Sequence, residues 1–371
     1  MGIQTLTIMA TGLLAGSFLI CVVLTAVVKV FSTRAGFVSK PVEDRFSRRV
    51  VPLGGGIAIF ITLASIIIAG AVSIRVLCSH ATVAELADRV NINPADFLAR
   101  SHELVIIVVC AFCLFALGLW DDKKHLGPGV KLAVQFAVAV IVAGFAETRV
   151  EFFIENRIIT SILSAIWIVV IINAFNFLDN MDGLAAGVAV IACGILFTAA
   201  AMSGQVFVGG LALIVVGTLL GFLVFNFPPA QIFMGDAGSL VVGFFVAFFT
   251  LRTTYYQQAV SGRWYPVLLP IIVMAVPLYD FMSVTLLRIR QGKSPFVGDT
   301  QHFSHRLKRR GLSDTQTVLT LYLATLATGL SAIFLYQVNS VGAILILIQT
   351  FMVLAIVAIL ESTGKNDKNG D

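Results

Sequence analysis

Long apolar stretches separated by short polar segments run through almost the whole chain. A helix needs about 20 mostly apolar residues to cross a bilayer. Eleven stretches approach this length, and each predicts one membrane-spanning helix. They cover residues 5–30, 54–77, 103–120, 129–147, 158–176, 183–202, 206–226, 237–253, 266–287, 315–336 and 340–360. We therefore expect an all-α polytopic membrane protein, with one integral membrane domain over residues 1–360 and a polar tail over residues 361–371.

Composition strengthens this interpretation. Only 12% of the 371 residues are charged and 58% are hydrophobic, whereas about a quarter of a soluble domain is charged. The net charge of +5 does not indicate a nucleic-acid partner, because the basic residues lie in short loops between the spans. Five scattered cysteines are too few for a disulfide framework. The first apolar stretch is long enough to span and has no small-residue cleavage site after it, so we expect a retained helix.

The basic residues also predict how the chain crosses the membrane, because Lys and Arg accumulate in cytoplasmic loops. With the spans numbered in order, 18 of the 25 basic residues lie on the side reached after odd-numbered spans, and seven lie on the other side. The N-terminus is therefore predicted outside and the C-terminus in the cytoplasm. Four polar segments with chemical promise follow spans 3, 5, 7 and 9, so all four are expected at the cytoplasmic face.

The first of these segments carries two adjacent carboxylates, Asp121 and Asp122, directly after Trp120. Adjacent carboxylates repel each other unless a cation is near, and this arrangement suits a general base or a magnesium ligand. The simpler interpretation is a solvated helix end, balanced by Lys123 and Lys124.

The second segment places four polar residues at intervals of three: Asn173, Asn176, Asp179 and Asp182. Continued as a helix, this spacing puts them near one stripe. Polar groups buried at the end of an apolar helix need partners, which a divalent cation, a sugar or a base would supply. A turn with Asp182 capping the next span is the simpler interpretation, but it explains one residue of the four.

The third segment contains Phe233 and Asp236 among glycines. Asp236 is a candidate oxygen ligand for a hard cation, and Phe233 could stack on a planar base. Alternatively, Asp236 only caps the following span, and Phe233 faces lipid or core.

The fourth segment contains His302, His305 and Arg306, followed by the basic run 308–310. Histidines three apart share a helical face, and the Arg306 guanidinium suits a phosphate. Zinc is a weaker interpretation, because no cysteine or second motif completes a site. A basic loop against anionic lipid fits the run 308–310 well and the histidines poorly, because histidines are mostly neutral at cytoplasmic pH.

Three weaker features accompany these segments. Lys131, nine residues after Asp122, could reach a phosphate or simply lie at the interface. Asp280 lies within span 9, about two turns before Arg288, and could pair with a cation or face a cavity. The glycine run that includes Gly55 could admit a substrate close to the backbone or make a tight helix entry.

Acids for magnesium, histidine and arginine for phosphate, and an aromatic ring for a base together favour phosphoryl transfer. The donor would be a soluble nucleotide and the acceptor would be carried by a lipid, with catalysis mostly by positioning and charge neutralisation. An ion-coupled transporter is the competing class. Transporters place their sites near the midplane and often have inverted repeats, whereas these acids are interfacial and the sequence shows no repeat.

The four segments, GLWDDKKHLGP, NAFNFLDNMDGLAAG, QIFMGDAGSL and QHFSHRLKRRG, resemble in this order the polyprenyl-phosphate N-acetylhexosamine-1-phosphate transferases. The likeness runs from about Lys40 to Arg310, and is greatest to bacterial undecaprenyl-phosphate N-acetylglucosamine-1-phosphate transferases. The family joins a UDP-N-acetylhexosamine to polyprenyl phosphate and releases UMP, with Mg²⁺ as cofactor, for which Mn²⁺ could substitute. The resemblance implies a multi-pass enzyme of the bacterial inner membrane, with a cytoplasmic active site, that starts a cell-envelope polysaccharide such as lipopolysaccharide or teichoic acid. A homodimer is compatible with it.

The resemblance also implies a role for each matching position. The paired aspartates that bind or deprotonate the lipid phosphate are Asp121 and Asp122. The magnesium ligands are Asp236 and Asn176. The residues near the nucleotide and sugar are Asn173, Asp179, Asp182, Phe233, which stacks on uracil, and Gly55. The groups around the diphosphate are Lys131, His302, His305 and Arg306. We favour direct attack of the lipid phosphate over an aspartyl intermediate, because it needs a single in-line displacement.

The sequence departs from the family pattern at three places, and the first of them bears on the substrate. HFSHRL differs from the triple-histidine run of the enzymes that transfer phospho-N-acetylmuramoyl-pentapeptide, which argues against that donor. Another UDP-N-acetylhexosamine remains an alternative to UDP-N-acetylglucosamine. Asn180 stands where the family often has glycine, and loop 78–102 is long but predicted to be extracytoplasmic.

Overall fold

The computed structural model describes residues 2–39, 50–77, 101–145, 156–253, 264–294 and 302–362. Loop 78–102, the tail 361–371 and the first basic loop therefore lie largely outside the described residues. Within these ranges the regular structure is helical, apart from a two-stranded antiparallel ribbon of β1 (Val38–Ser39) and β2 (Val51–Pro52) and a single β-bridge between Leu53 and Phe233. The all-α prediction is confirmed for this part of the chain.

Ten of the described helices are long and apolar enough to cross a membrane. They are α1 (Gly2–Arg34), α2 (Gly55–Leu77), α5 (Ser101–Lys124), α6 (Pro128–Phe145), α7 (Arg157–Leu178), α8 (Leu184–Met202), α9 (Val206–Asn226), α10 (Gly235–Arg252), α14 (Asp314–Ile333) and α15 (Ser340–Ser362). Two shorter elements, α13 (Phe303–Arg309) and η2 (Phe334–Tyr336), flank α14. The multi-pass prediction is confirmed.

The eleventh predicted span, 266–287, is not one straight helix. It consists of η1 (Tyr265–Leu268), α11 (Leu269–Val273) and α12 (Ala275–Arg290), with a bend of 63° between α11 and α12. Pro277 explains the break, because a proline has no N–H and its ring clashes with the carbonyl four residues earlier, here that of Val273. Counted as one bent span, this unit brings the total to eleven.

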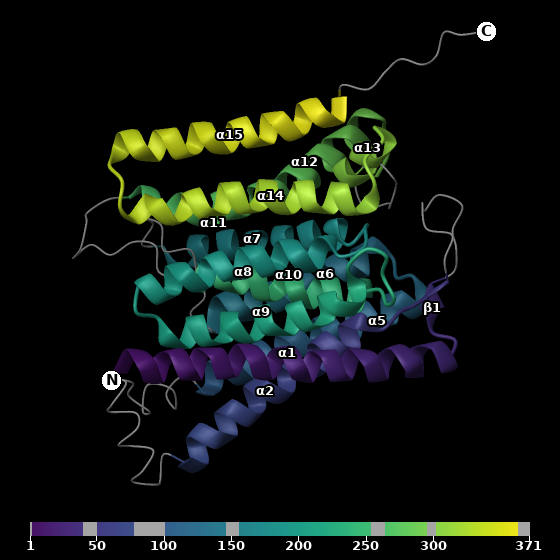
Figure 1. Cartoon of the computed structure of the whole chain (residues 1–371), viewed down its shortest axis with the longest axis vertical. Coiled ribbons are helices and arrows are strands. Elements are labelled where there is room, and N and C mark those ends of the chain that lie inside the picture. Colours follow the sequence, from purple (N-terminus) through teal and green to yellow (C-terminus); the bar gives the residue numbers. More distant parts are fainter. Residues whose placement is uncertain are drawn as a thin grey trace.

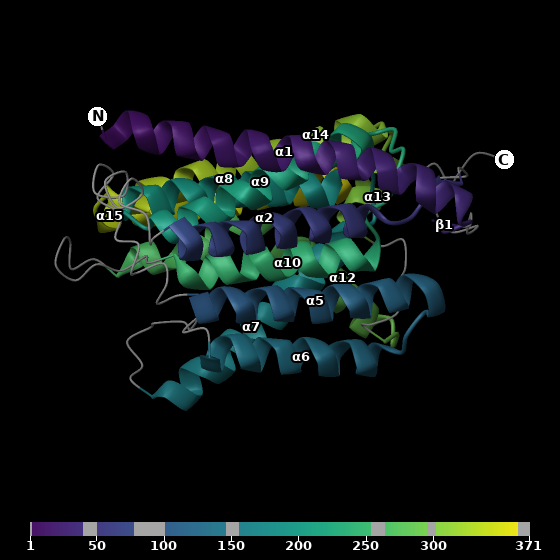
Figure 2. The same cartoon turned by 90° about the horizontal axis from the view of Figure 1, so that it is seen from below.

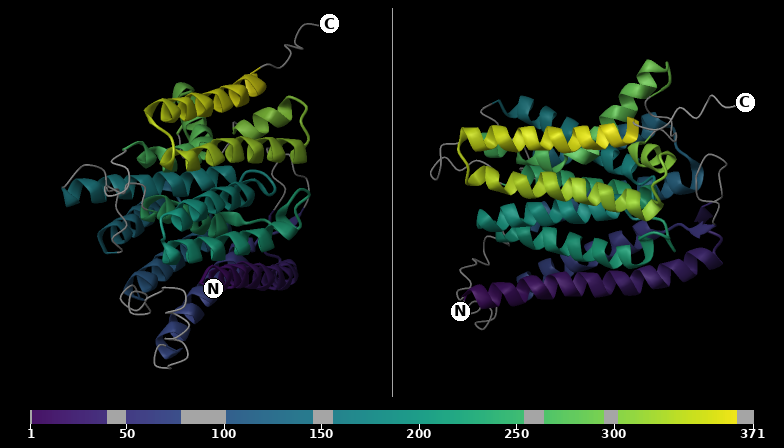
Figure 3. Two further views of the ribbon diagram at one scale, coloured as in Figure 1. Left: turned by 60° about the vertical axis from the view of Figure 1, so that its left-hand side comes forward. Right: turned by 45° about the horizontal axis from the view of Figure 1, so that its top comes forward.

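The long helices lie roughly parallel, so their ends gather at two faces (Figures 1 and 2). Helix α1 forms one flank, and α14 and α15 lie side by side on the opposite flank (Figure 3). The start of α1 and the end of α15 lie at opposite faces (Figure 1). The face where α15 ends also holds β1 and α13, and we call it the site face.

Helix α10 lies at the centre of the bundle and positions the site. It packs against α2, α5, α7 and α8, and its aromatic residues Phe244, Phe245, Phe248 and Phe249 are fully buried. The neighbours approach closely at glycines: a Cβ on Gly243 would lie 2.8 Å from the Cα of Ile172. This packing fixes the first turn of α10 at the site face.

Candidate active site

The predicted site residues come from helix ends that meet at the site face. The last turns of α5 and α7 approach the first turns of α6 and α10 there, and α13 lies beside them (Figures 1 and 2). Helix α5 continues to Lys124, beyond the predicted end at 120, so Asp121 and Asp122 belong to its last turn.

Lys131 joins the first and third segments. Its ammonium group donates to Oδ2 of Asp121 and to Oδ2 of Asp236, the latter at 2.9 Å. Asp121 is 5% exposed, and its other oxygen accepts the backbone N–H of Leu126 at 2.5 Å. The side chains of Lys131 and Asp236 are each about a quarter exposed. One positive charge therefore bridges a buried carboxylate, that of Asp121, and a partly exposed one, that of Asp236.

The second segment reaches the same cluster through Asn176. Its amide nitrogen donates to Oδ1 of Asp236 at 3.0 Å and to Oγ of Ser239 at 2.9 Å. Ser239, one turn along α10 from Asp236, is fully buried. We call Asp121, Asp122, Lys131, Asn176 and Asp236 the acidic cluster; four separate helices supply it.

Asp122 has a different function in the fold from its neighbour Asp121. Its two oxygens accept the backbone N–H groups of Asp236 at 2.8 Å and Ala237 at 3.1 Å. A carboxylate at a helix N-terminus satisfies unpaired N–H groups and interacts favourably with the helix dipole. Asp122 thus caps α10 from another helix, and the alternative that Asp236 caps its own helix is wrong, because that side chain contacts Lys131 and Asn176.

Glycines make this close approach feasible. Gly235 has a φ of +70°, and a Cβ on it would lie 2.6 Å from Oδ2 of Asp122. A Cβ on Gly118 would lie 2.4 Å from the carbonyl oxygen of Asp236. Any larger residue at either position would separate α5 from the first turn of α10.

Gly55 is buried, and its backbone forms a hydrogen bond with that of Phe233. Its N–H donates to the carbonyl of Phe233 at 2.9 Å, while the N–H of Phe233 donates to the carbonyl of Pro52 at 2.9 Å. A Cβ on Gly55 would lie 2.4 Å from the ring of Phe222. The observed role of Gly55 is close packing, and contact with a nucleotide sugar stays a prediction. Phe233, which these two backbone hydrogen bonds hold, is half-buried.

The polar stripe of the second segment is shorter than predicted. Helix α7 ends at Leu178, so only Asn173 and Asn176 are helical; Asp179 is the C-cap residue and Asp182 lies in the following turn. Asn173 points elsewhere, since its amide donates to Oε1 of Gln135 at 2.6 Å. The helical stripe ends because the chain turns at residues 179–183.

The turn 179–183 is held by partners far away in sequence. Asp182 accepts the backbone N–H of Ala230 at 2.9 Å and does not cap α8, whose N-cap is Gly183. The N–H of Gly183 donates to Oδ1 of the buried Asn226 at 3.0 Å. Sequence reasoning missed Asn226, although a lone amide at the end of the apolar helix α9 was a detectable signal.

The two histidines of the fourth segment face each other, but only His305 lies within a helix. His302 is the N-cap of α13, with an extended backbone, and the ring centroids are 6.3 Å apart. Both residues are buried. Burial is the largest cause that lowers the pKa of His305 to about 4, and the positive charges of Arg309 and Lys308 add to it. His305 is therefore neutral at neutral pH.

Arg306 is held by two partners that sequence reasoning missed. Its guanidinium donates to Oγ of Ser283 at 3.0 Å and forms an ion pair with Glu361 at 3.1 Å. Glu361, near the end of α15, also accepts the hydroxyl of Tyr279 at 2.6 Å. A phosphate that bound Arg306 would compete with this carboxylate.

A hydrogen bond connects the turn 179–183 to α13. Oγ of Ser304 donates to Oδ1 of Asn180 at 2.6 Å, and the amide nitrogen of Asn180 donates to the carbonyl of Phe177 at 2.6 Å. Asn180, the departure from the family pattern, thus links the second segment to the fourth.

The donor set of the acidic cluster suits a hard divalent cation. Asp236 offers carboxylate oxygens, and the amide nitrogen of Asn176 is occupied, so its carbonyl oxygen would be the ligand atom. Mg²⁺ is commonly held by one or two carboxylates together with substrate phosphates and water. In the described part of the chain no three His, Cys, Asp or Glu side chains form a metal-binding group, so an all-protein cage is not formed there.

Comparison with known proteins gives the same family as the sequence motifs. Glycosyl transferase family 4 matches residues 104–254. A probable undecaprenyl-phosphate N-acetylglucosaminyl 1-phosphate transferase of Bacillus subtilis is 31% identical over 356 residues, covering 94% of this chain and 90% of that protein. The chain belongs to the polyprenyl-phosphate N-acetylhexosamine-1-phosphate transferases.

Two further members of this transferase family are similar along most of their length. A decaprenyl-phosphate N-acetylglucosaminephosphotransferase of Mycolicibacterium smegmatis is 30% identical, covering 81% of this chain and 75% of that protein. An undecaprenyl-phosphate alpha-N-acetylglucosaminyl 1-phosphate transferase of Yersinia pestis is 26% identical, covering 91% and 86%. The family match at residues 104–254 contains the whole acidic cluster, whereas α13 lies beyond it.

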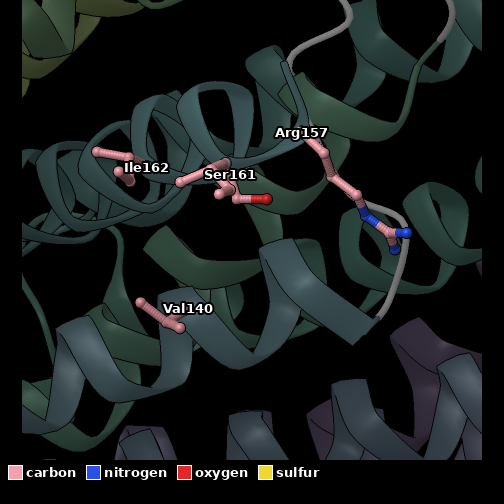
Figure 4. Close-up of a pocket in the computed structure, with 5 residues that line it drawn as sticks. Val140, Arg157, Ser161 and Ile162 are labelled. Carbon is pink, nitrogen blue, oxygen red and sulfur yellow. The ribbon is translucent and has the colours of Figure 1, made fainter. Parts of the chain in front are cut away.

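A separate pocket of this transferase lies away from the acidic cluster. It has a volume of about 350 Å³ and lies between α6 and α7, lined by Val140, Arg157, Ile158, Ser161 and Ile162 (Figure 4). Arg157 begins α7, whereas Asn176 lies near the opposite end of that helix. The pocket therefore has no part in the site formed by the acidic cluster.

Proposed function

We propose that this transferase moves N-acetylglucosamine 1-phosphate from UDP-N-acetylglucosamine to undecaprenyl phosphate and releases UMP. The product would start a lipid-linked cell-envelope polysaccharide. The observation that carries this proposal is the acidic cluster, in which Lys131 bridges Asp121 and Asp236 while Asn176 binds Asp236. The names of the relatives in Bacillus subtilis and Yersinia pestis support N-acetylglucosamine as the sugar.

The cluster combines the charges that phosphoryl transfer requires. A diphosphate donor and a phosphate acceptor bring negative charge together, and catalysis depends on neutralising and orienting it. Lys131 supplies a fixed cation at the surface of the cluster, and Arg306 supplies a planar guanidinium on α13. On binding, the phosphates would take over hydrogen bonds that Asp121, Asp236 and Glu361 now accept.

Mg²⁺ is the cofactor that we propose, with Asp236 and the carbonyl oxygen of Asn176 as its protein ligands. When bound, it would neutralise charge on the diphosphate of the donor. Lys131 would then share Asp236 with the metal and hold Asp121 in place. Mn²⁺, which has the same preference for oxygen ligands, could substitute.

The contacts of the two aspartates favour direct attack by the lipid phosphate. Asp122 uses both oxygens to cap α10, and Asp121 is buried between Lys131 and a backbone N–H, so neither is free to become a nucleophile. An oxygen of the lipid phosphate would attack the β-phosphorus, and the bond from that phosphorus to the bridging oxygen would break as UMP leaves. Asp121 and Lys131 would orient the attacking phosphate.

The bilayer and the cytoplasm supply the two substrates from different directions. Lys123, Lys124 and Lys131 lie at the site face, while Arg157 and Arg252 lie at the other end of the same bundle. This bias and the positive-inside rule favour a cytoplasmic site face in a bacterial inner membrane. A UDP-sugar would then arrive from the cytoplasm and the lipid phosphate from the membrane.

The proposal is tested by measuring UMP release from purified protein in detergent. Release is expected from UDP-N-acetylglucosamine only when undecaprenyl phosphate and Mg²⁺ are both present, and it should be lost in Asp236→Ala. Asp314→Asn, which removes a carboxylate paired with Lys308 outside the cluster, is the matched control and should keep turnover. A panel with UDP-N-acetylgalactosamine and UDP-N-acetylmuramoyl-pentapeptide identifies the donor. Lipid-independent release, or none from any donor, would contradict the proposal.

A further inference from the structure

Asp280 is a fully buried carboxylate inside the bent span, and it lies outside the acidic cluster. Its Oδ2 lies 2.9 Å from Nδ1 of His302, and its Oδ1 accepts the backbone N–H of Phe303 at 3.0 Å. These two contacts join α12 to the start of α13 across 22 residues of chain. A buried charge is stable only when it is well paired, and Asp280 has both a side-chain and a backbone partner.

The donor and acceptor chemistry of this contact fixes the proton on His302. A carboxylate only accepts hydrogen bonds, and a neutral imidazole carries one N–H and one lone pair. In the neutral ring Nδ1 must therefore be the donor to Asp280, which leaves Nε2 as an acceptor. The hydrogen bond at one ring nitrogen thus determines whether the other ring nitrogen is a donor or an acceptor.

Neighbouring rings restrict the orientation of the imidazole. Phe177 meets His302 edge-on at 5.4 Å between centroids, and His305 meets it at 6.3 Å. The guanidinium of Arg288 lies over the ring of Phe177, 5.0 Å from the ring centroid. Phe177 directly follows Asn176, so His302 contacts the helix turn that contributes to the acidic cluster.

We propose that Asp280 is a positioning residue for the transfer reaction: it holds His302 with the proton on Nδ1 and so presents Nε2 to the bound donor substrate as an acceptor. The part of this inference that concerns the reaction rests on the proposed function. The tautomer itself is a property of the protein alone and can be measured without turnover.

The sharpest test is Asp280→Asn, because it separates the two contacts. The asparagine Oδ1 still accepts the N–H of Phe303, but its NH₂ group donates to Nδ1 of His302 and drives the proton to Nε2. In protein labelled with ¹⁵N-histidine, the shifts of Nδ1 and Nε2 of His302 should exchange, with His302→Gln assigning the signal. We expect kcat/KM for the UDP-sugar to fall about 10- to 100-fold, as for other residues that orient a functional histidine. KM for the lipid phosphate should stay unchanged.

Asp280→Glu keeps a carboxylate and should retain the original tautomer and recover part of kcat/KM, whereas Asp314→Asn should change neither quantity. A wild-type His302 with its proton on Nε2 would overturn the proposal without any variant, even if Asp280→Asn does not fold. A tautomer exchange without loss of turnover would also overturn it. If wild-type protein releases no UMP, the proposed function fails, and the tautomer measurement still decides whether Asp280 orients His302.

Discussion

Lys131 bridges the neighbouring carboxylates of Asp121 and Asp236 and compensates their negative charge. Lys131→Met should remove activity and destabilise the fold by about 1–3 kcal/mol, less than for a fully buried pair because the lysine is partly exposed. Adding Asp236→Asn should restore part of the melting temperature but not the activity. Thermal unfolding in detergent is the measurement, and Lys124→Met, at an exposed lysine near the end of α5, is the control. Equal melting temperatures for wild type and Lys131→Met would contradict the bridging role.

Asp122 should behave as a helix cap. Asp122→Ala leaves two backbone N–H groups of α10 without their partner, so we expect the free energy of unfolding to fall by about 1–2 kcal/mol. Activity should also be lost, because Asp236 would be displaced. Asp122→Asn keeps an acceptor oxygen and should retain most of the melting temperature. If both variants unfold like wild type and only turnover is lost, Asp122 acts on the substrate and its capping is incidental.

His305 should make the protein less stable in acid. Its pKa is lowered to about 4 in the fold, whereas an unfolded histidine titrates near 6.5. Between these values the unfolded chain binds more protons, so stability falls as pH decreases from about 6.5 to 4. The melting temperature of His305→Gln should fall less steeply over this window. The same slope in both proteins would show that the burial of His305 is not what costs stability.

The sequence was sufficient to find which side chains carry chemistry but not what each one contacts. Asp121, Lys131, Asn176 and Asp236 were predicted, and the structure brings them together. The capping role of Asp122 and the partners Ser239, Asn226 and Glu361 were not, because each contact joins residues 40 or more positions apart. Local spacing contains no information about such pairs.

The close packing of α2 against α10 requires a glycine at position 56. A Cβ on Gly56 would lie 2.3 Å from the backbone nitrogen of Gly238, which cannot move without shifting α10. Gly56→Ala should cost about 1–3 kcal/mol of stability and reduce turnover on the order of tenfold to a hundredfold. Gly70→Ala, on the same helix with open space around it, should be neutral or slightly stabilising. Equal behaviour of the two variants in melting and turnover would exclude this packing constraint.

The sequence predicted the elements well where length and apolar content decide them. The described spans agree with the predicted ones to within a few residues: α1 and α5 run longer, and the bent span ends at Arg290 instead of at residue 287. The bend before α12 was not predicted, although Pro277 is visible, because hydropathy cannot distinguish one bent span from a straight one. The ribbon of β1 and β2 was also not predicted, because strands of two residues are too short to show a periodic pattern.

For the whole molecule, the unequal distribution of basic residues predicts which face meets the cytoplasm. In a variant without the native cysteines, Met202→Cys should react with an impermeant maleimide added to intact cells, while Lys124→Cys should react only after the membrane is opened. Both positions are exposed, and they lie at opposite faces of the bundle. The reverse labelling pattern would place the acidic cluster outside the cytoplasm and remove its access to UDP-sugars.

Helix α10 has the lowest mean hydropathy of the candidate spans and is also the most completely buried. It would gain least by entering lipid alone, yet the helices that it contacts most, α2, α5, α7 and α8, all precede it in the chain. Because these helices are synthesised before α10, we expect α10 to insert against protein surfaces. The order of the helices along the chain thus provides an order of assembly, in which the central helix α10 inserts after the helices that surround it.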